Sequence, residues 1–436
     1  MSNLPDSLDA WLAHLERLHP KGQAGIDLGL DRIGRLKEAL LQKQHCPVII
    51  VGGTNGKGST CAYLESILTF AGYRVGCYTS PHLFAYNERV RLDRRPVADA
   101  TLCEAFAKVE KARREAGDVA LTYFEFGTLA AWEVFSQADV EVAILEVGLG
   151  GRLDAVNAYD PDVAIVTSVD LDHTDWLGPT REHIGFEKAG IYRSGKPAFC
   201  ADAEPPKTLL EHVATIGADL HLIGREFGFS RQADNRHEWR WWCRSGTELI
   251  KRSLSYPSLR GASQLSNAAV ALAALQALAG RLPVPMHAIR RGLIETELPG
   301  RFQVLPGRPA IVLDVAHNPQ AVRALAENLG DMGFFDRTYA VVGMLADKDA
   351  AGALLPLKGK VDYWHLATLE GSRGASAERL ADVVAENHLG GEVLPFDSPD
   401  VALRAALGRA AESDRILVFG SFYTVAGVRD ALKDGR

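Results

Sequence analysis

The feature that most constrains the fold is a strand, a glycine-rich turn and a helix that follow one another directly between residues 48 and 72. Val48–Val51 is an unbroken run of β-branched residues, which is typical of a strand buried on both faces. Apolar residues then recur at helical spacing, at Leu64, Ile67, Leu68 and Ala71. Gly72 offers a stop for this helix. The glycine-rich segment GGTNGKGS therefore joins a strand to a helix.

This turn has the composition of a phosphate-binding loop. At such a junction, backbone N–H groups and the start of a helix face an anion, and Lys57 adds a positive charge. The usual pattern, G-x-x-x-x-G-K-[ST], places a hydroxyl directly after the lysine, whereas here Gly58 follows Lys57 and Ser59 comes one position later. Ser59 still lies in the first helical turn, where its hydroxyl can meet a magnesium ion. The alternative is a simple turn with a solvated lysine, which the flanking strand and helix disfavour.

Strand-like and helix-like stretches alternate through most of the chain, which favours βαβ units and a parallel sheet with helices on both faces. Further strands are predicted at residues 74–78, 140–147, 163–169, 310–315, 339–342 and 416–419. Between 239 and 256, tryptophans alternate with other residues, which predicts a hairpin. A helix is predicted from Asn267 to Ala279. Leu298-Pro299-Gly300 then interrupts the pattern. We therefore expect an α/β protein with a larger domain over residues 1–297 and a smaller one over 298–436.

Hard metal ligands follow two of the predicted strands. Glu146 ends one strand, and Asp170, Asp172, His173 and Asp175 follow another. Carboxylates at the ends of parallel strands are suited to a magnesium ion on a nucleotide, although a carboxylate at a strand end is common in any α/β protein. The residues alone thus predict a magnesium-dependent enzyme that uses a nucleoside triphosphate, and they leave its substrate open.

Composition narrows the class of protein. The 436 residues exceed what one hydrophobic core usually supports, and 47% apolar with 24% charged residues is typical of a soluble globular protein. A net charge of −7 argues against a protein that coats nucleic acid. Six cysteines without a C-x-x-C pair suit a reducing cytosol. The acidic N-terminus does not resemble a signal peptide, and no apolar run is long enough for a membrane span. We expect a cytoplasmic monomer with no nucleic-acid or membrane partner.

A set of motifs adds a resemblance to this interpretation. In chain order they are GTNGKGST, TSPHL with ERV, LEVGLGGRLDAVN, DHTDWLG, FEKAGI, PGRFQV, DVAHNP and GSFYTV. With IDLGLDRI near the N-terminus, they resemble the folylpolyglutamate synthase and dihydrofolate synthase branch of the Mur ligase family. The resemblance implies an N-terminal P-loop ATPase domain with a parallel sheet and a smaller, Rossmann-like C-terminal domain that closes over ATP. It also implies an ADP-forming ligase that needs Mg²⁺ and joins L-glutamate to dihydropteroate and tetrahydrofolate.

The resemblance implies a role for each residue that matches a family motif. The positions implied to bind ATP are Thr54, Asn55, Gly56, Lys57, Gly58, Ser59, Asn267, Arg301 and Asp314. Those implied to bind the metal are Ser59, Ser80, Glu146 and His173. Those implied to be catalytic are Lys57, His173 and Lys188, of which Lys188 matches a lysine that is carbamylated in relatives. Those implied to surround the pterin are Thr122, Tyr123, Phe124, Glu125, Leu153, Asp154 and Ala155. His317 and Ser421 are the candidates for the glutamate side.

Several alternatives remain at this stage. Many relatives have Gly-x-His-Gln before the helix that carries Asn267, whereas this chain has Gly261-Ala262-Ser263-Gln264, which removes one expected nucleotide contact. Ser80 before Pro81 is also compatible with a plain turn, and Thr122 and Tyr123 with packing. The alternative functions are a Mur-type amino-acid ligase acting on a UDP-muramyl precursor and a P-loop kinase or nucleotide switch.

Overall fold

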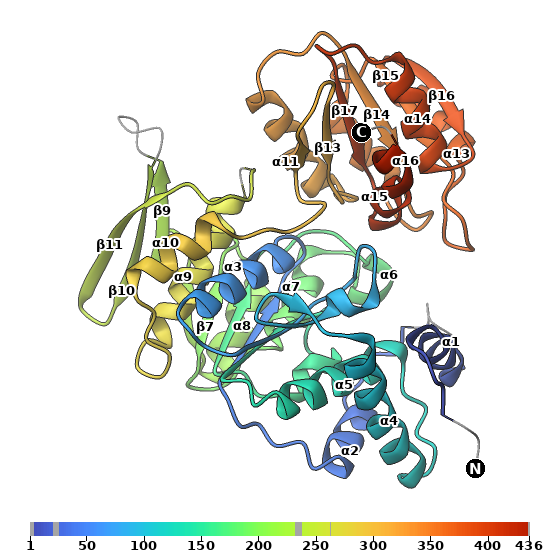
Figure 1. The fold of residues 1–436 in the computed structure, drawn as a ribbon. Helices are drawn as coiled ribbons and strands as arrows, with labels where there is room; N and C mark the ends of the chain where they lie inside the picture. The colour runs from blue at the N-terminus through green and yellow to red at the C-terminus, as the bar shows by residue number, and fades with distance from the viewer. Residues whose placement is uncertain (1–3, 21–25, 232–237, 262, 435–436) are drawn as a thin grey trace. The chain divides into compact units, whose positions relative to one another are not determined.

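The structure is a computed structural model that describes residues 4–20, 26–231, 238–261 and 263–434. The chain forms two compact units (Figure 1). The first consists of Met1–Ser258 and Leu265–Thr296, and the second of Leu259–Gln264 and Glu297–Arg436. None of the helices within the described residues is long and apolar enough to cross a membrane.

The first unit is built on an eight-stranded sheet with the order β4-β3-β2-β5-β1-β6-β7-β8. The strands from β2 to β8 in this order are parallel, and β3 and β4 are added antiparallel at one edge. The strands are β1 Val48–Gly52, β2 Val75–Tyr78, β3 Val90–Leu92, β4 Arg95–Pro96, β5 Val142–Glu146, β6 Val163–Val166, β7 Pro197–Cys200 and β8 Asp219–Leu222. Every residue of β1 is buried, as its β-branched composition predicts.

Helices cover this sheet and form the main hydrophobic core with it. They are α1 Leu8–Leu18, α2 Asp31–Ala39, α3 Lys57–Phe70, α4 Asp99–Glu115, α5 Tyr123–Gln137, α6 Thr174–Leu177, α7 Arg181–Ala189 and α8 Lys207–Ile216, with short 3₁₀ turns η1 Tyr86–Arg89 and η2 Ala155–Ala158. The predicted helix after the glycine turn is α3. Ala71 caps its end and Gly72 follows in the left-handed region, as the sequence predicts.

A small antiparallel sheet and two helices complete the first unit. Strands β9 Phe227–Arg231, β10 Glu238–Ser245 and β11 Glu248–Ser255 confirm the predicted hairpin. The helices are α9 Gln264–Ala277 and α10 Met286–Ile294, so the helix predicted from Asn267 begins three residues earlier and ends at Ala277. Leu265 of the first turn stands at helical spacing with Ala268, Ala269 and Leu272, a signal that the predicted start at Asn267 overlooked.

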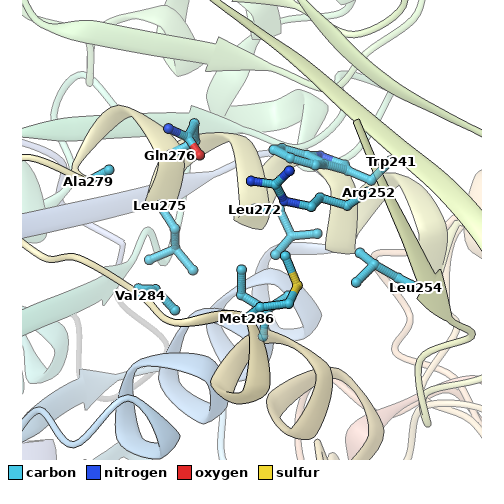
Figure 2. Close-up of a pocket in the computed structure, with 10 residues that line it drawn as sticks. Trp241, Arg252, Leu254, Leu272, Leu275, Gln276, Ala279, Val284 and Met286 are labelled. Carbon is cyan, nitrogen blue, oxygen red and sulfur yellow. The ribbon is translucent and has the colours of Figure 1, made fainter. Parts of the chain in front are cut away.

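The hairpin packs on these helices around a buried tryptophan. Trp241 Nε1 donates a hydrogen bond to the carbonyl of Ala269 in α9 at 3.1 Å. A cavity of about 150 Å³ remains beside this contact, with Arg252 as its one charged lining residue (Figure 2). Its other lining residues include Leu272 and Leu275 of α9 and Met286 of α10.

The second unit has a six-stranded sheet with the order β12-β13-β17-β14-β15-β16, parallel except for β12. Its strands are β12 Gln303–Leu305, β13 Ala310–Leu313, β14 Thr338–Val342, β15 Tyr363–Ala367, β16 Glu392–Phe396 and β17 Arg415–Phe419. Its helices are α11 Pro319–Asp331, α12 Ala350–Leu354, α13 Ala377–Glu386, α14 Pro399–Arg409, α15 Phe422–Gly427 and α16 Arg429–Asp434, with the 3₁₀ turn η3 Leu355–Leu357. The α/β class and the mostly parallel sheets are confirmed.

Candidate active site

The glycine turn between β1 and α3 forms a closely packed loop. Gly53 and Gly56 have φ angles of 139° and 91°, in the region that favours glycine. A side chain on Gly53 would collide with Thr167. Lys57 Nζ donates to the carbonyls of Gly53 and Thr54 at 3.0 and 3.2 Å, so the lysine folds back over the loop. The loop thus has the shape and charge of an anion-binding site.

Residues that follow β6 hold the other side of this loop. Thr54 N donates to the Ser168 carbonyl at 2.8 Å, and the Thr54 hydroxyl donates to the Asp170 carbonyl at 3.1 Å. Thr167 Oγ1 donates to the Asn55 carbonyl at 2.7 Å. These bonds explain why β6 ends at Val166 and not at the predicted residue 169. Residues after the strand bind the phosphate loop instead of continuing the sheet.

Two further predicted ATP-binding positions lie at this loop. Ser59 is in the first turn of α3 and is buried. Asn267 of α9 is also buried, and its Oδ1 lies 2.5 Å from the position that a Cβ on Gly56 would take. The structure therefore brings Asn267 against the loop across some two hundred residues of sequence. Residues 261–264 form the segment that differs from the Gly-x-His-Gln motif of many relatives, and Ala262 in this segment lies outside the described residues.

The candidate metal ligands include one direct contact. Glu146 ends β5, is buried, and its Oε2 accepts a hydrogen bond from Ser80 N at 2.9 Å. This contact forms because Ser80 follows β2, the neighbour of β5 in the sheet. His173 occupies the N-cap position of α6 with a φ of 50°, and its backbone N–H donates to Asp172 Oδ1 at 2.9 Å.

The donor types at this site suit a hard cation that also binds phosphate. Among the residues described, no group of three or more His, Cys, Asp or Glu side chains is placed to hold a metal. A magnesium ion usually takes one or two carboxylates and completes its shell with phosphate oxygens and water. The carboxylate of Glu146 beside Ser80, on the same sheet as the phosphate loop, fits this donor set.

Lys188 has the most unusual environment of the predicted catalytic residues. It lies near the end of α7, and the residue is 4% exposed. Burial, and next the positive charge of Lys57, lower its pKa from 10.5 to about 7, against the opposing charges of Asp172 and Asp154. Near neutral pH, a large share of the Lys188 side chains therefore carries a neutral amine.

Asp154 complements Lys188 in the same cluster. It caps η2, and its Oδ2 and Oδ1 accept hydrogen bonds from Leu149 N at 2.8 Å and Val156 N at 3.0 Å. Burial raises its pKa to about 7, although these N–H donors and Lys57 favour the ionised form. The charges of Lys57, Asp154 and Asp172 thus all act on Lys188.

The predicted pterin surroundings lie together at the end of β5. Phe124 packs against Gly148, because a Cβ on that glycine would lie 2.7 Å from the Phe124 ring. The same ring lies 5.7 Å from that of Tyr78. The neighbouring predicted residues Tyr123 and Ala155 are buried, and the Leu153 carbonyl accepts a hydrogen bond from Gly29 N.

Thr122 and Glu125 have a structural task in this region. The Thr122 hydroxyl accepts from Glu125 N at 3.1 Å, and Glu125 Oε2 accepts from Thr122 N at 2.7 Å, which forms a capping box for α5. Arg32 Nε also donates to Glu125, at 3.1 Å. No local sequence pattern predicts this contact, because Arg32 and Glu125 lie 93 positions apart in the chain.

The remaining ATP candidates lie in the second unit. Asp314 follows β13, and its oxygens accept from Phe302 N at 2.8 Å and Ala316 N at 2.7 Å. Burial raises the Asp314 pKa, and the charge of Arg301 opposes this. The Arg301 guanidinium lies 5.2 Å from the centre of the Phe422 ring. Asp314 therefore organises the segment that carries Arg301.

The two candidates for the glutamate side also lie in the second unit. His317 Nδ1 is 2.8 Å from the Val315 carbonyl, a contact that holds the ring when Nδ1 carries the proton. Ser421 is buried and caps α15, where its Oγ accepts from Tyr423 N at 3.1 Å.

A phosphate loop, a carboxylate at an adjoining strand and a mostly parallel sheet define a P-loop nucleotide-binding protein. Two family models extend this definition: "Mur ligase middle domain" matches residues 51–275, and "Mur ligase, glutamate ligase domain" matches residues 300–422. Together they span most of both units.

Individual relatives are more specific. The chain is 47% identical to a dihydrofolate synthase/folylpolyglutamate synthase of Escherichia coli K12, over 98% of this chain and 95% of the relative. A Haemophilus influenzae protein of the same name is 40% identical, with 96% of each covered. A structure of E. coli FolC in complex with DHPP and ADP matches with a TM-score of 0.91 at 45% identity, over 100% of this chain and 99% of that one. A Yersinia pestis bifunctional enzyme complexed with AMPPNP and Mn matches with a TM-score of 0.87 at 45% identity, over 99% and 100%. The chain belongs to the dihydrofolate synthase/folylpolyglutamate synthase branch of the Mur ligase family.

Proposed function

We propose that the protein is an ATP-dependent ligase that adds L-glutamate to dihydropteroate and to folates, with release of ADP and phosphate. The observation that carries this proposal is the phosphate loop itself, with Lys57 folded over it, Asn267 against Gly56 and the buried Glu146 carboxylate held by Ser80 on the same sheet. Relatives with near full-length coverage bear the names of both activities. These relatives favour the proposed function over a ligase with a UDP-linked acceptor and over a nucleotide switch.

The chemistry requires activation of a carboxylate. A carboxylate resists attack by an amine, because the attack builds further charge on an anion, whereas an acyl phosphate has a good leaving group. Transfer of the γ-phosphoryl group of ATP to the acceptor's carboxylate forms this acyl phosphate, and the glutamate amine then displaces phosphate. Phosphoryl transfer depends on positioning and charge neutralisation, which Lys57 and the loop N–H groups of residues 54–59 provide. The acyl phosphate hydrolyses readily, so exclusion of water favours the amine.

We assign magnesium binding to Ser59, Ser80, Glu146 and His173. When bound, the ion neutralises phosphate charge during transfer. Glu146 supplies the buried carboxylate, and the backbone N–H of Ser80 holds its Oε2. Two observations support this assignment: these side chains offer oxygen and nitrogen donors, and Glu146 and Ser80 lie on the same sheet as the phosphate loop.

We assign a carbamate to Lys188. An amine attacks carbon dioxide only when neutral, and a pKa of about 7 makes the neutral form abundant. The carbamate is an anionic oxygen ligand of the kind that hard cations prefer. We expect Lys188→Ala to be nearly inactive and to regain activity with added formate or acetate. Full activity of Lys188→Arg, which keeps the charge and cannot be carbamylated in this way, contradicts the assignment.

The remaining residues receive roles by position. We propose that residues 1–297 bind ATP and the pterin, and that residues 298–436 close over ATP and glutamate. Asn267, Arg301 and Asp314 then contact ATP, and His317 and Ser421 serve the glutamate side. Residues 122–125 and 153–155 surround the pterin. We also propose a cytoplasmic monomer that requires no nucleic acid or membrane, which gel filtration of the active fraction and cell fractionation test.

One assay separates this function from the alternatives. ATP hydrolysis is measured with dihydropteroate, tetrahydrofolate or a UDP-muramyl precursor, each with and without glutamate or another amino acid. We expect turnover with the two pteridine acceptors and glutamate. Withholding glutamate should allow positional isotope exchange in ATP and trapping of a hydroxamate by hydroxylamine. Turnover with the muramyl precursor alone, or a stable phosphorylated product, contradicts the proposal.

A further inference from the structure

A buried ion pair joins α3, the helix that follows the phosphate loop, to β3. Strand β3 is the neighbour of β2, after which Ser80 lies. Arg91 of β3 donates from Nε to both carboxylate oxygens of Glu65, at 3.1 and 3.0 Å, and from Nη2 to Oε2 at 2.8 Å. The side chains of Arg91 and Glu65 are 14% and 4% exposed. Glu65 lies on α3, about two helical turns after Lys57.

The same guanidinium reaches two further oxygen acceptors. Nη1 of Arg91 donates to Thr79 Oγ1 at 2.9 Å and to the Glu88 carbonyl at 2.8 Å. Nη2 also lies 3.2 Å from the Cys77 sulfur. A lysine in this position has no planar fork and could not hold the carboxylate and these acceptors together. The planar fork of Arg91 therefore connects three separate segments: α3, the end of β2, and η1.

The acceptor at Thr79 connects this pair to the proposed metal site. Thr79 directly precedes Ser80, whose N–H donates to Glu146 at 2.9 Å. Glu88, the third acceptor residue, holds the segment after Ser80, because its carboxylate accepts from the N–H groups of residues 83, 84 and 85 at 2.7 to 2.8 Å. Arg91 thus restrains the chain on both sides of Ser80.

A second buried pair in the first unit makes no connection to the Ser80 segment, although Glu110 also accepts from Arg114 Nε at 2.6 Å and lies 3.5 Å from His14 Nε2. Arg113 of α4 donates from Nε and Nη2 to Glu110 at 2.7 and 3.0 Å, and the two side chains are 9% and 0% exposed. Arg113 otherwise contacts the Val119 carbonyl and Asp118, both just after the same helix. Its contacts stay within one local segment, whereas those of Arg91 join the helix of the phosphate loop to the Ser80 segment.

We propose that Arg91, held by Glu65, is a positioning residue that fixes Ser80 relative to the phosphate-loop helix and thereby sets the affinity for the metal–nucleotide complex. The proposal rests on the metal role of Ser80 in the proposed function. Residues that orient a metal ligand without touching the metal typically change metal affinity about 10- to 100-fold when they are replaced.

The mildest test changes only the acceptor at residue 79. Thr79→Val removes the hydroxyl at nearly constant shape, and Thr79→Ser retains it as the matched control. The affinity for Mn²⁺ with AMPPNP is measured by electron paramagnetic resonance, without turnover. We expect affinity to fall at least about fivefold in Thr79→Val and to stay near wild type in Thr79→Ser. Equal affinity in the wild type and both variants overturns the proposal.

A second test replaces each buried pair by apolar residues, since such replacements often preserve stability. Glu65→Leu/Arg91→Met is compared with Glu110→Leu/Arg113→Met, with the melting temperature recorded for both. We expect only the first double variant to lose Mn²⁺ affinity, by about tenfold or more, with a raised KM for ATP. Equal losses in the two double variants, or none, refute the positioning role. If the first variant does not fold, the Thr79 pair decides.

The outcomes also separate this proposal from the proposed function. If the wild type binds no Mn²⁺ in the presence of AMPPNP, the proposed metal site is wrong. The positioning role of Arg91 is then wrong as well. A wild type that binds Mn²⁺ with AMPPNP and catalyses ligation, combined with variants of unchanged affinity, overturns the role of Arg91 alone.

Discussion

Replacing Lys188 by methionine should stabilise the fold while it abolishes ligation. Burial lowers the Lys188 pKa from 10.5 to about 7. Because each pH unit corresponds to about 1.4 kcal/mol, keeping this ammonium protonated in the folded protein costs about 5 kcal/mol. Methionine is similar in length and carries no charge, so Lys188→Met removes that cost. A residue that lowers stability and is needed for activity is expected at a functional site.

The stability difference between Lys188→Met and the wild type should depend on pH. Between about pH 7 and 10.5, folded Lys188 binds fewer protons than the same residue in the unfolded chain, so the contribution of Lys188 to stability becomes less unfavourable as pH rises. Below pH 7 both states are protonated and the full cost remains. The methionine side chain does not titrate. The stability advantage of Lys188→Met is therefore largest near pH 6 and shrinks by about 2 kcal/mol between pH 7 and pH 9.

Urea unfolding followed by circular dichroism at pH 6, 7, 8 and 9 measures this advantage. The buffers are depleted of carbon dioxide and contain a chelator, so that neither a carbamate nor a metal alters the titration. Lys111→Met serves as the control, because Lys111 is 75% exposed and its replacement should have a small effect at every pH. An advantage of Lys188→Met that does not narrow between pH 7 and pH 9 refutes the reasoning.

Three further outcomes are expected. Lys57→Ala should keep its fold by circular dichroism and lose ligation, since one charge-stabilising group at a phosphate is typically worth about 3–4 kcal/mol of barrier; near wild-type kcat would argue against the assignment. Gly56→Ala should weaken ADP binding measured by calorimetry. The added Cβ would lie 2.5 Å from Asn267 Oδ1, and the φ of 91° at residue 56 disfavours a side chain. Unchanged ADP affinity would show that the loop adapts. Trp241→Phe should cost about 0.5–1.5 kcal/mol in urea unfolding at unchanged kcat, because it removes the hydrogen bond that Trp241 Nε1 donates to the Ala269 carbonyl; a stability equal to wild type would mean that this bond makes no net contribution.

The sequence alone was sufficient for those elements whose signal lies within a few residues. The strand, turn and helix from Val48 to Phe70 follow from a β-branched run, glycines and apolar residues at helical spacing. The hairpin of β10 and β11 follows from alternation over two residues. These patterns repeat with the period of one strand or one helix, so no distant contact is needed to recognise them. The α/β class follows from the order of such elements.

Local patterns predicted the ends of elements less well where a distant residue decides them. β6 stops at Val166 because Thr167 bonds to Asn55, more than one hundred residues earlier in the chain. The helix of Asn267 begins at Gln264, directly after a segment that includes Gly261, and the chain's path there fixes its start. In both cases a side chain's partner or the backbone's path decides the boundary.

The chemistry of the candidate site depends on tertiary structure. Motifs single out Lys188 and Glu146, but the low pKa of Lys188 arises from burial and from Lys57 on another element. Glu146 meets Ser80 only because β5 and β2 are neighbours in the sheet. No sequence pattern predicts that Arg91 pairs with Glu65, which lies 26 residues earlier in the chain. Desolvation and charge–charge interactions depend on distances through space, and only the folded chain determines which residues share one low-dielectric environment.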